Sequence, residues 1–186
     1  MTRNAGEAPA DTAGHKKVSE GEAVHAVVDA LKTSMRQGRM PFLEVSSNSM
    51  APLLRRGQRI GLAPAQAHQL RSGDVVTFLE DGHLTTHRFW GRDDPYLKSR
   101  GDRSGQFDRP WRREALIGRV VMYQAAGRSM WLDHGTGRYL NRLLFCAGKC
   151  EERLLAWCLP ARPVRVAIRL LATMMTAAAY RSREVL

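Results

Sequence analysis

The sequence has too few cysteines for disulfide bonds to hold its fold together. It contains three, an odd number confined to the last quarter of the chain: Cys146, Cys150 and Cys158. Small proteins that depend on disulfides carry more cysteines, in even numbers, so we expect a protein that folds in a reducing compartment. Spacings of four and eight residues place the thiols on one side of a helix, without the histidine or fourth thiol that a metal site would need. We therefore expect them to pack as small apolar side chains against the core.

The chain also lacks a long hydrophobic run. Residues 1–17 are small and polar, which predicts a disordered tail and neither a signal peptide nor a membrane anchor. Residues 164–180 are more apolar, but arginines interrupt them and the uninterrupted part is shorter than a membrane span. This segment predicts a helix that packs on the preceding one, lies in a membrane interface or binds a partner. We expect a cytoplasmic protein, or one held peripherally at a membrane by this C-terminal helix.

Acidic residues are scarce relative to basic ones. The chain has 29 lysines and arginines against 18 aspartates and glutamates, a formal net charge of +11 and a pI near 10.4. Such a charge favours anionic partners such as nucleic acid, anionic lipid or acidic peptides. However, the arginines are scattered, and no zinc finger, helix-turn-helix pattern or aromatic-interleaved basic helix accompanies them. No specific nucleic-acid partner is therefore expected.

The apolar pattern predicts a mainly β (α+β) fold. A capping box begins at Ser19, apolar residues follow at helical spacing, and Gly38 ends the helix. Short apolar runs then predict strands at 42–45, 60–62, 75–78, 84–90, 96–97 and 116–122. Asp81 and Gly82 stand between two of these runs and predict a type I′ hairpin. A second amphipathic helix is expected over 139–157.

One serine stands where a strand ends and a proline-stiffened turn begins. Ser49 lies in Asn-Ser-Met-Ala-Pro-Leu, shortly after the strand-like run that ends at Val45. A serine in such a place can expose its hydroxyl to a cleft, but it needs a nearby base to act as a nucleophile. His87, on the return strand of the predicted hairpin, and then Asp102 and Asp108 follow it along the chain. His68 and His83 lie in loop or turn sequence, where we expect them to be solvated.

Ser49 is also the first of a series of motifs. In chain order these are Ser-Met-x-Pro at 49–52, Arg-Gly at 56–57, Arg-Ser-Gly-Asp-Val-Val-Thr-Phe at 71–78, His-Arg at 87–88, Lys-Ser-Arg-Gly-Asp at 98–102 and Ile-Gly-Arg-Val at 117–120. The ordered set, over residues 38–124, resembles the signal peptidase I branch of the LexA/signal peptidase superfamily. In that superfamily the general base is either a lysine or, in archaeal and endoplasmic-reticulum-type enzymes, a histidine. His87 stands at the position of the base, so the resemblance implies the histidine type, and Lys98 is not expected to be the base.

The resemblance implies a serine endopeptidase with a small, curled, barrel-like β core and with no metal or cofactor. Ser49 would attack the peptide carbonyl, and His87 would take and return the proton. The residue that orients His87 is implied seven positions after Gly101, which makes Asp108 the first choice and Asp102 the second. This peptidase domain would span residues 18–126, between the tail at 1–17 and a helical C-terminal extension at 127–186.

The resemblance also implies the donors that stabilise the oxyanion of the transition state. They are the hydroxyl of Ser47 and the backbone N–H of Ser49, with Asn48 between them where the family usually has glycine. The expected partner is a peptide or precursor protein that binds as an extended strand, with small residues near the scissile bond. Two alternatives remain open: a non-catalytic peptide-binding module on the same fold, and a LexA-like regulator that cleaves itself.

Overall fold

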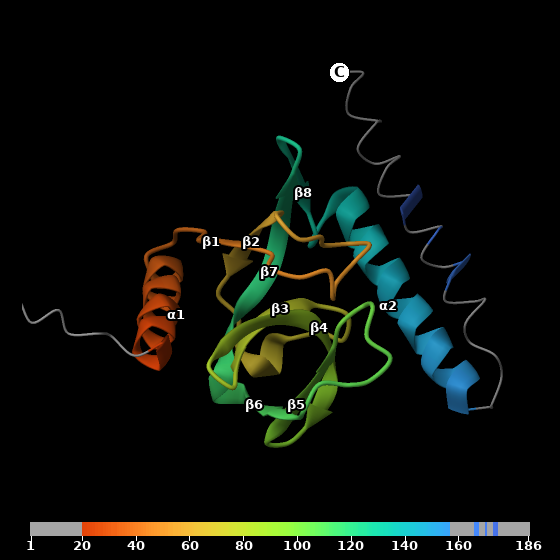
Figure 1. Ribbon diagram of the computed structural model, residues 1–186, viewed down its shortest axis with the longest axis horizontal. Coiled ribbons are helices and arrows are strands. Elements are labelled where there is room, and N and C mark those ends of the chain that lie inside the picture. Colours follow the sequence, from red (N-terminus) through yellow and green to blue (C-terminus); the bar gives the residue numbers. More distant parts are fainter. Residues whose placement is uncertain (1–19, 157–165, 168–169, 171–172, 175–186) are drawn as a thin grey trace, which may run out of the picture.

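The computed structural model describes residues 20–156, 166–167, 170 and 173–174, in which helices pack on an eight-stranded antiparallel sheet (Figure 1). Its elements are α1 (Glu20–Arg36), β1 (Phe42–Glu44), β2 (Arg59–Ala63), η1 (Ala67–Gln69), β3 (Val75–Glu80), β4 (His83–Asp93), β5 (Tyr96–Arg100), β6 (Trp111–Arg112), η2 (Arg113–Ala115), β7 (Leu116–Ala125), β8 (Arg128–Trp131) and α2 (Gly135–Ala156). The mainly β fold is therefore confirmed. The predicted tail at 1–17, Ser19 of the capping box, Cys158 and most of the apolar segment at 164–180 lie outside the described residues.

The sheet curls but does not close into a barrel. Its strand order is β1-β2-β7-β3-β4-β5-β6, and β8 pairs with β7. Strand β4 is long enough to have two different environments. Its second half, from Arg88 to Asp93, pairs with β5, whereas His83–His87 pairs among the described residues with β3 alone. Strand β1 likewise has a single pairing partner, β2. Among the described residues, β1 and the first half of β4 therefore each have an open strand edge, as do the terminal strands β6 and β8.

The predicted hairpin between β3 and β4 is confirmed. Asp81 and Gly82 both have positive φ, at 45° and 78°, as a type I′ turn requires. The register pairs Glu80 with His83 next to the turn, and Val76 with His87 further along. The hairpin therefore places His87 four residues along β4 from His83, the first residue after the turn.

Both long helices contribute to one hydrophobic core. Helix α1 buries Val28, Leu31 and Met35 on the sheet, and α2 buries Leu140 and Leu144 in the same cluster. Helix α1 approaches β7 closely at Gly118, where an added Cβ would lie 3.1 Å from the sulfur of Met35. Among the described residues, we find no helix whose length and apolar character would allow it to cross a membrane.

The cysteines of α2 correct one expectation. Cys146 and Cys150 are exposed free thiols and do not pack against the core. The buried side of α2 is set by Leu140 and Leu144. At about 100° per residue, Cys146 lies about 160° around the helix from Leu144, on the outer face. Spacing placed the two cysteines on one stripe correctly, but it could not tell which stripe the sheet would cover.

Candidate active site

Ser49 lies in the loop between β1 and β2, which is anchored to the core directly after it. Met50, Leu53 and Leu54 are almost completely buried. On the other side, the side-chain oxygen of Asn48 accepts a hydrogen bond from the backbone N–H of Arg56 at 3.1 Å. Ser49 itself is only partly buried. The loop is therefore fixed on both sides of a serine that remains accessible.

Ser49 opens into a cleft of about 750 Å³ between the open edges of β1 and of the first half of β4. Its walls are formed by Val24 of α1, by β1 together with the loop that follows it, and by the β3–β4 hairpin. Ser49 and His87 both line this cleft. The volume is in the range of sites that bind small molecules or short peptide segments.

The structure brings Ser49, His87 and Asp108 together in a chain of hydrogen bonds. The Oγ of Ser49 lies 3.0 Å from Nε2 of His87, and Nδ1 of His87 lies 2.8 Å from Oδ2 of Asp108. The side chains of His87 and Asp108 are 15% and 12% exposed. Because a carboxylate accepts at Nδ1, the imidazole proton belongs on that nitrogen, which leaves the lone pair of Nε2 facing the serine hydroxyl. This arrangement can remove a proton from Ser49.

Asp102, the second choice for the residue that orients His87, lies against a different partner. Its two carboxylate oxygens accept hydrogen bonds from Nε and Nη2 of Arg88, each at 2.7 Å. The side chains of Arg88 and Asp102 are 1% and 8% exposed. Arg88 also donates to the carbonyl oxygen of Gly73 and to Asn141 of α2. Asp102 is thus part of a buried clamp that joins β4, the turn after β5 and α2.

Two residues to which the motifs assigned no role hold Asp108 in place. Ser99 is completely buried on β5. Its hydroxyl accepts a hydrogen bond from Nε1 of Trp111 at 2.9 Å and donates to Oδ2 of Asp108 at 2.6 Å. Its carbonyl oxygen also accepts from the backbone N–H of Asp108 at 3.0 Å. The indole N–H can only donate, so it turns the proton of Ser99 toward the carboxylate that faces His87.

The turn that begins at Gly101 packs directly on Ser49 and His87. A Cβ built on Gly101 would lie 3.0 Å from the carbonyl oxygen of Ser49 and 3.1 Å from Nε2 of His87. The backbone N–H of Arg103 donates to the same carbonyl oxygen at 2.8 Å. A side chain at this position would press on the loop of Ser49 and on the imidazole, which favours glycine there.

The remaining sequence candidates have clear locations. Ser47 is exposed beside the nucleophile, with its Oγ 3.1 Å from Oγ of Ser49 and 3.4 Å from the backbone nitrogen of Ser49. His68 and His83 are exposed as expected, and His83 lines the cleft. Lys98 forms an exposed ion pair with Asp93 and does not line the cleft.

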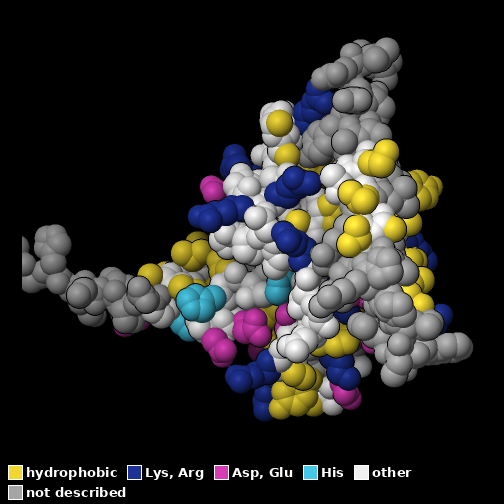
Figure 2. Space-filling model, turned by 45° about the vertical axis from the view of Figure 1, so that its right-hand side comes forward, with side chains coloured by type: hydrophobic (Ala, Val, Ile, Leu, Met, Phe, Trp, Pro, Cys, Tyr) yellow, Lys and Arg dark blue, Asp and Glu magenta, His cyan; other side chains and the backbone are white. Residues whose placement is uncertain are grey.

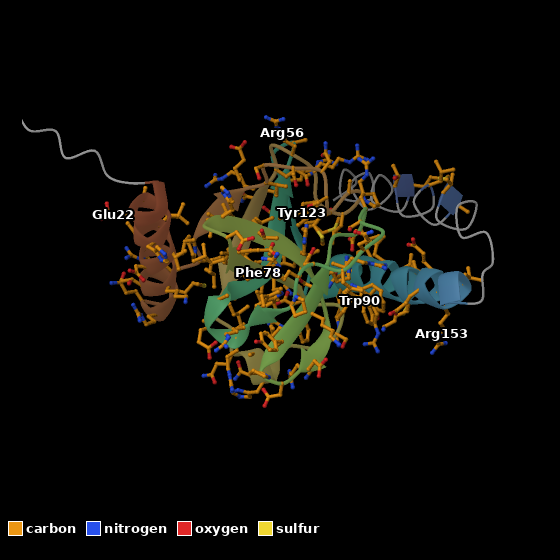
Figure 3. The ribbon with its side chains drawn as sticks, turned by 60° about the horizontal axis from the view of Figure 1, so that its bottom comes forward. Glu22, Arg56, Phe78, Trp90, Tyr123 and Arg153 are labelled. Carbon is orange, nitrogen blue, oxygen red and sulfur yellow. The ribbon has the colours of Figure 1, made fainter. Side chains whose placement is uncertain are left out.

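The loop that carries Asp108 rests on α2 through aromatic contacts. The ring of Phe107 packs edge-on against Trp90 of β4, with a centroid distance of 5.2 Å. Trp90 in turn packs edge-on against Phe145 of α2 at 5.3 Å, and the guanidinium of Arg100 lies over its ring. Figure 3 shows Trp90 where the sheet meets α2. Helix α2 therefore stabilises the segment that carries Asp108.

The comparison with protein families agrees with this geometry. The family model described as Peptidase S24-like matches residues 10–121, more than half of the chain. The chain belongs to the Peptidase S24-like family. Membership places it in the LexA/signal peptidase superfamily and associates it with peptidases and self-cleaving proteins of this fold. The S24-like match includes Ser49, His87 and Asp108, whereas β8 and α2 lie beyond its end. No curated protein matches the chain.

Replacing Ser99 with alanine tests its effect on Asp108. The variant removes one donor to the carboxylate, so we expect kcat to fall about 10- to 100-fold with little change in KM. It also leaves the indole N–H of Trp111 buried without its acceptor, which should lower the free energy of unfolding by about 1–3 kcal/mol. Peptide turnover and urea denaturation measure the two effects.

A second substitution separates positioning from stability. Trp111→Phe in the Ser99→Ala background removes the unpaired N–H while keeping a ring that can stack on Phe78. We expect the double variant to regain stability but not kcat. Ser129→Ala, which changes an exposed serine of β8 outside the site, is the control. Recovery of both stability and kcat would show that Ser99 acts on the fold alone.

Proposed function

We propose that the protein is a serine endopeptidase of the histidine type that cleaves a precursor or leader peptide. The observation that supports it best is the pair of short contacts made by His87, 3.0 Å to Oγ of Ser49 and 2.8 Å to Oδ2 of Asp108. These contacts supply a nucleophile, a base and a group that orients the base, as acyl transfer requires. None of the described residues that line the cleft is a lysine, which favours His87 as the base.

In the proposed mechanism, His87 accepts the hydroxyl proton of Ser49 at Nε2 as Oγ bonds to the peptide carbonyl carbon. The carbonyl oxygen becomes an oxyanion that accepts hydrogen bonds from the hydroxyl of Ser47 and the backbone N–H of Ser49. His87 then gives the proton to the leaving nitrogen, the C–N bond breaks, and an acyl-enzyme remains. Water, deprotonated by His87, then attacks the ester carbon. The C–Oγ bond breaks, His87 returns the proton to Oγ of Ser49, and the peptide leaves with its new carboxyl end. Asp108 keeps the imidazole in one tautomer throughout.

The open strand edges suggest how the substrate binds. An extended peptide placed along His83–His87 of β4 can form the main-chain hydrogen bonds that β5 forms with the second half of the strand. The edge of β1 offers a second row of donors and acceptors across the cleft. A peptide bound there would have its scissile bond next to Ser49. The close approach of Gly101 to Ser49 and His87 leaves little room, so we expect small residues beside that bond.

Covalent labelling tests the nucleophile. A fluorophosphonate or a boronic acid should form an adduct with Ser49 in the native protein, because the His87 contact activates that hydroxyl. Intact-mass and peptide-mapping spectra locate the adduct. We expect it to disappear in Ser49→Ala and to be strongly reduced in His87→Ala, while Ser46→Ala, a change of an exposed cleft residue, should label normally. An adduct on a different residue would contradict the assignment.

A further inference from the structure

The cleft beside Ser49 has a charge opposite to that of the protein. The chain has a formal net charge of +11, yet among the described residues that line this cleft the only acidic or basic ones, apart from histidines, are Glu44 and Glu80. In two other hollows the charged lining residues are mostly arginines: Arg55, Arg56 and Arg59 in one, and Arg71, Arg119, Arg138 and Arg142, together with Asp74 and Asp133, in the other. Figure 2 shows a face on which acidic side chains lie beside histidines, with lysine and arginine side chains gathered above them. The cleft is therefore a negative region in a strongly positive surface.

The two glutamates also differ from most other carboxylates in the structure. Carboxylates elsewhere pair with cations of this chain, as Asp93 does with Lys98, Asp102 with Arg88 and Glu152 with Lys149. Within the described part of the chain, Glu44 and Glu80 have no ion-pair partner. They lie on separate strands, β1 and β3, at different walls of the cleft. Arg59 stands directly opposite Glu44 in the register of β1 and β2, whereas Glu80 stands opposite His83, so the charge of Glu80 is the more available of the two to a bound molecule.

The register of the hairpin places Glu80 relative to the reaction centre. Glu80 pairs with His83, and Val76 pairs with His87, so Glu80 lies four positions along the hairpin from the base. At about 3.3 Å per residue this separation is about 13 Å. An extended peptide bound along β4 would thus bring a residue three to five positions from its scissile bond next to Glu80. The side chain of a lysine or arginine is long enough to reach a carboxylate at this place.

We propose that this cleft selects peptides that carry lysine or arginine about three to five residues from the cleaved bond, with Glu80 and Glu44 as the specificity-determining residues. The inference rests on the proposed peptidase function. It follows from charge complementarity, since unpaired carboxylates favour a cation at that place and disfavour an acidic residue. A positively charged protein would otherwise prefer acidic peptides, so the prediction is opposite in sign to the one that net charge gives.

A synthetic decapeptide library of mixed sequence tests the inference on the full chain. Cleavage sites are mapped by mass spectrometry, and kcat/KM is then measured on two peptides that differ only by lysine or norleucine at the enriched position. We expect the lysine peptide to be favoured about two- to fivefold per carboxylate at low salt, and less as ionic strength rises. Glu80→Gln should remove most of the preference, and Glu44→Gln should reduce it. Asp29→Asn, which changes an exposed carboxylate of α1 outside the cleft, should leave it unchanged.

The outcomes separate the inference from the function on which it rests. Cleavage that requires Ser49 but shows no enrichment of lysine or arginine would overturn the specificity and leave the peptidase intact. Enrichment that survives in Glu80→Gln and Glu44→Gln together would also overturn it. Absence of any cleavage that depends on Ser49 would instead remove the proposed function itself.

Discussion

Replacing Ser49 with alanine is expected to lower peptide hydrolysis by about 10⁴-fold or more, because the variant has no oxygen to attack the carbonyl carbon. Peptide binding should persist, since the cleft and both strand edges are unchanged. The fold should persist as well, because the side chain of Ser49 is partly exposed and its contacts are with His87 and Ser47. Turnover followed by mass spectrometry and peptide binding followed by fluorescence anisotropy measure the two properties separately.

The same pair of measurements distinguishes the alternatives to a peptidase acting on other proteins. A non-catalytic peptide-binding module would bind equally well with serine or alanine at this position and would show no turnover in either form. A self-cleaving regulator would cut its own chain at a rate independent of protein concentration, and the fragment would be absent from Ser49→Ala. Turnover of an added peptide that is unchanged in Ser49→Ala would contradict the nucleophile assignment.

Replacing Asp102 with asparagine is expected to lower the free energy of unfolding by about 3–5 kcal/mol. The substitution leaves the guanidinium of Arg88 buried without its ionic partner, and an uncompensated buried charge is strongly destabilising. Asp108→Asn should instead affect activity much more than stability. It should reduce kcat by about 10⁴-fold, because the imidazole loses the partner that holds its tautomer, while changing stability far less. Urea denaturation and turnover, measured on both variants, give the comparison.

Asp93→Asn is a suitable control for this pair of variants. Asp93 forms an exposed ion pair with Lys98, with side chains 70% and 46% exposed. Such a pair contributes about 0–1 kcal/mol, so the control should be nearly as stable as the native protein. If Asp102→Asn were as stable as this control but inactive, Asp102 rather than Asp108 would be the residue that orients His87.

Much of the fold could be predicted from the sequence because its signals are local. The helical spacing of apolar residues in α1 and the Asp-Gly turn of the hairpin depend on neighbours in the chain, and both predictions were confirmed. Strands β6 and β8 were missed. Strand β6 has two residues, too few for a period to show. Strand β8 follows a tight turn at Gly127, in a segment that we expected to belong to the helical extension.

The candidate site could be predicted only in part, for a related reason. The motifs named Ser49, His87 and Asp108, and the structure places them within hydrogen-bonding distance. The sequence could not decide between Asp102 and Asp108, because the choice depends on Arg88. Its guanidinium pairs with Asp102, and Asp108 forms the hydrogen bond with His87. Ser99 was visible in a motif, but its contact with Trp111 joins residues on different strands. Only the folded sheet shows such a contact.

The contacts that Arg88 and Trp90 make with α2 determine how much of the chain the proposed active site needs. The S24-like match ends within β7. Beyond its end, Asn141 of α2 accepts a hydrogen bond from Arg88, and Phe145 of α2 packs against Trp90, which in turn contacts Phe107. A fragment trimmed to the matched region would retain all three proposed catalytic side chains. It would nevertheless lose the α2 contacts beneath the loop that carries Asp108, so the helix beyond the family boundary is a structural component of the proposed active site.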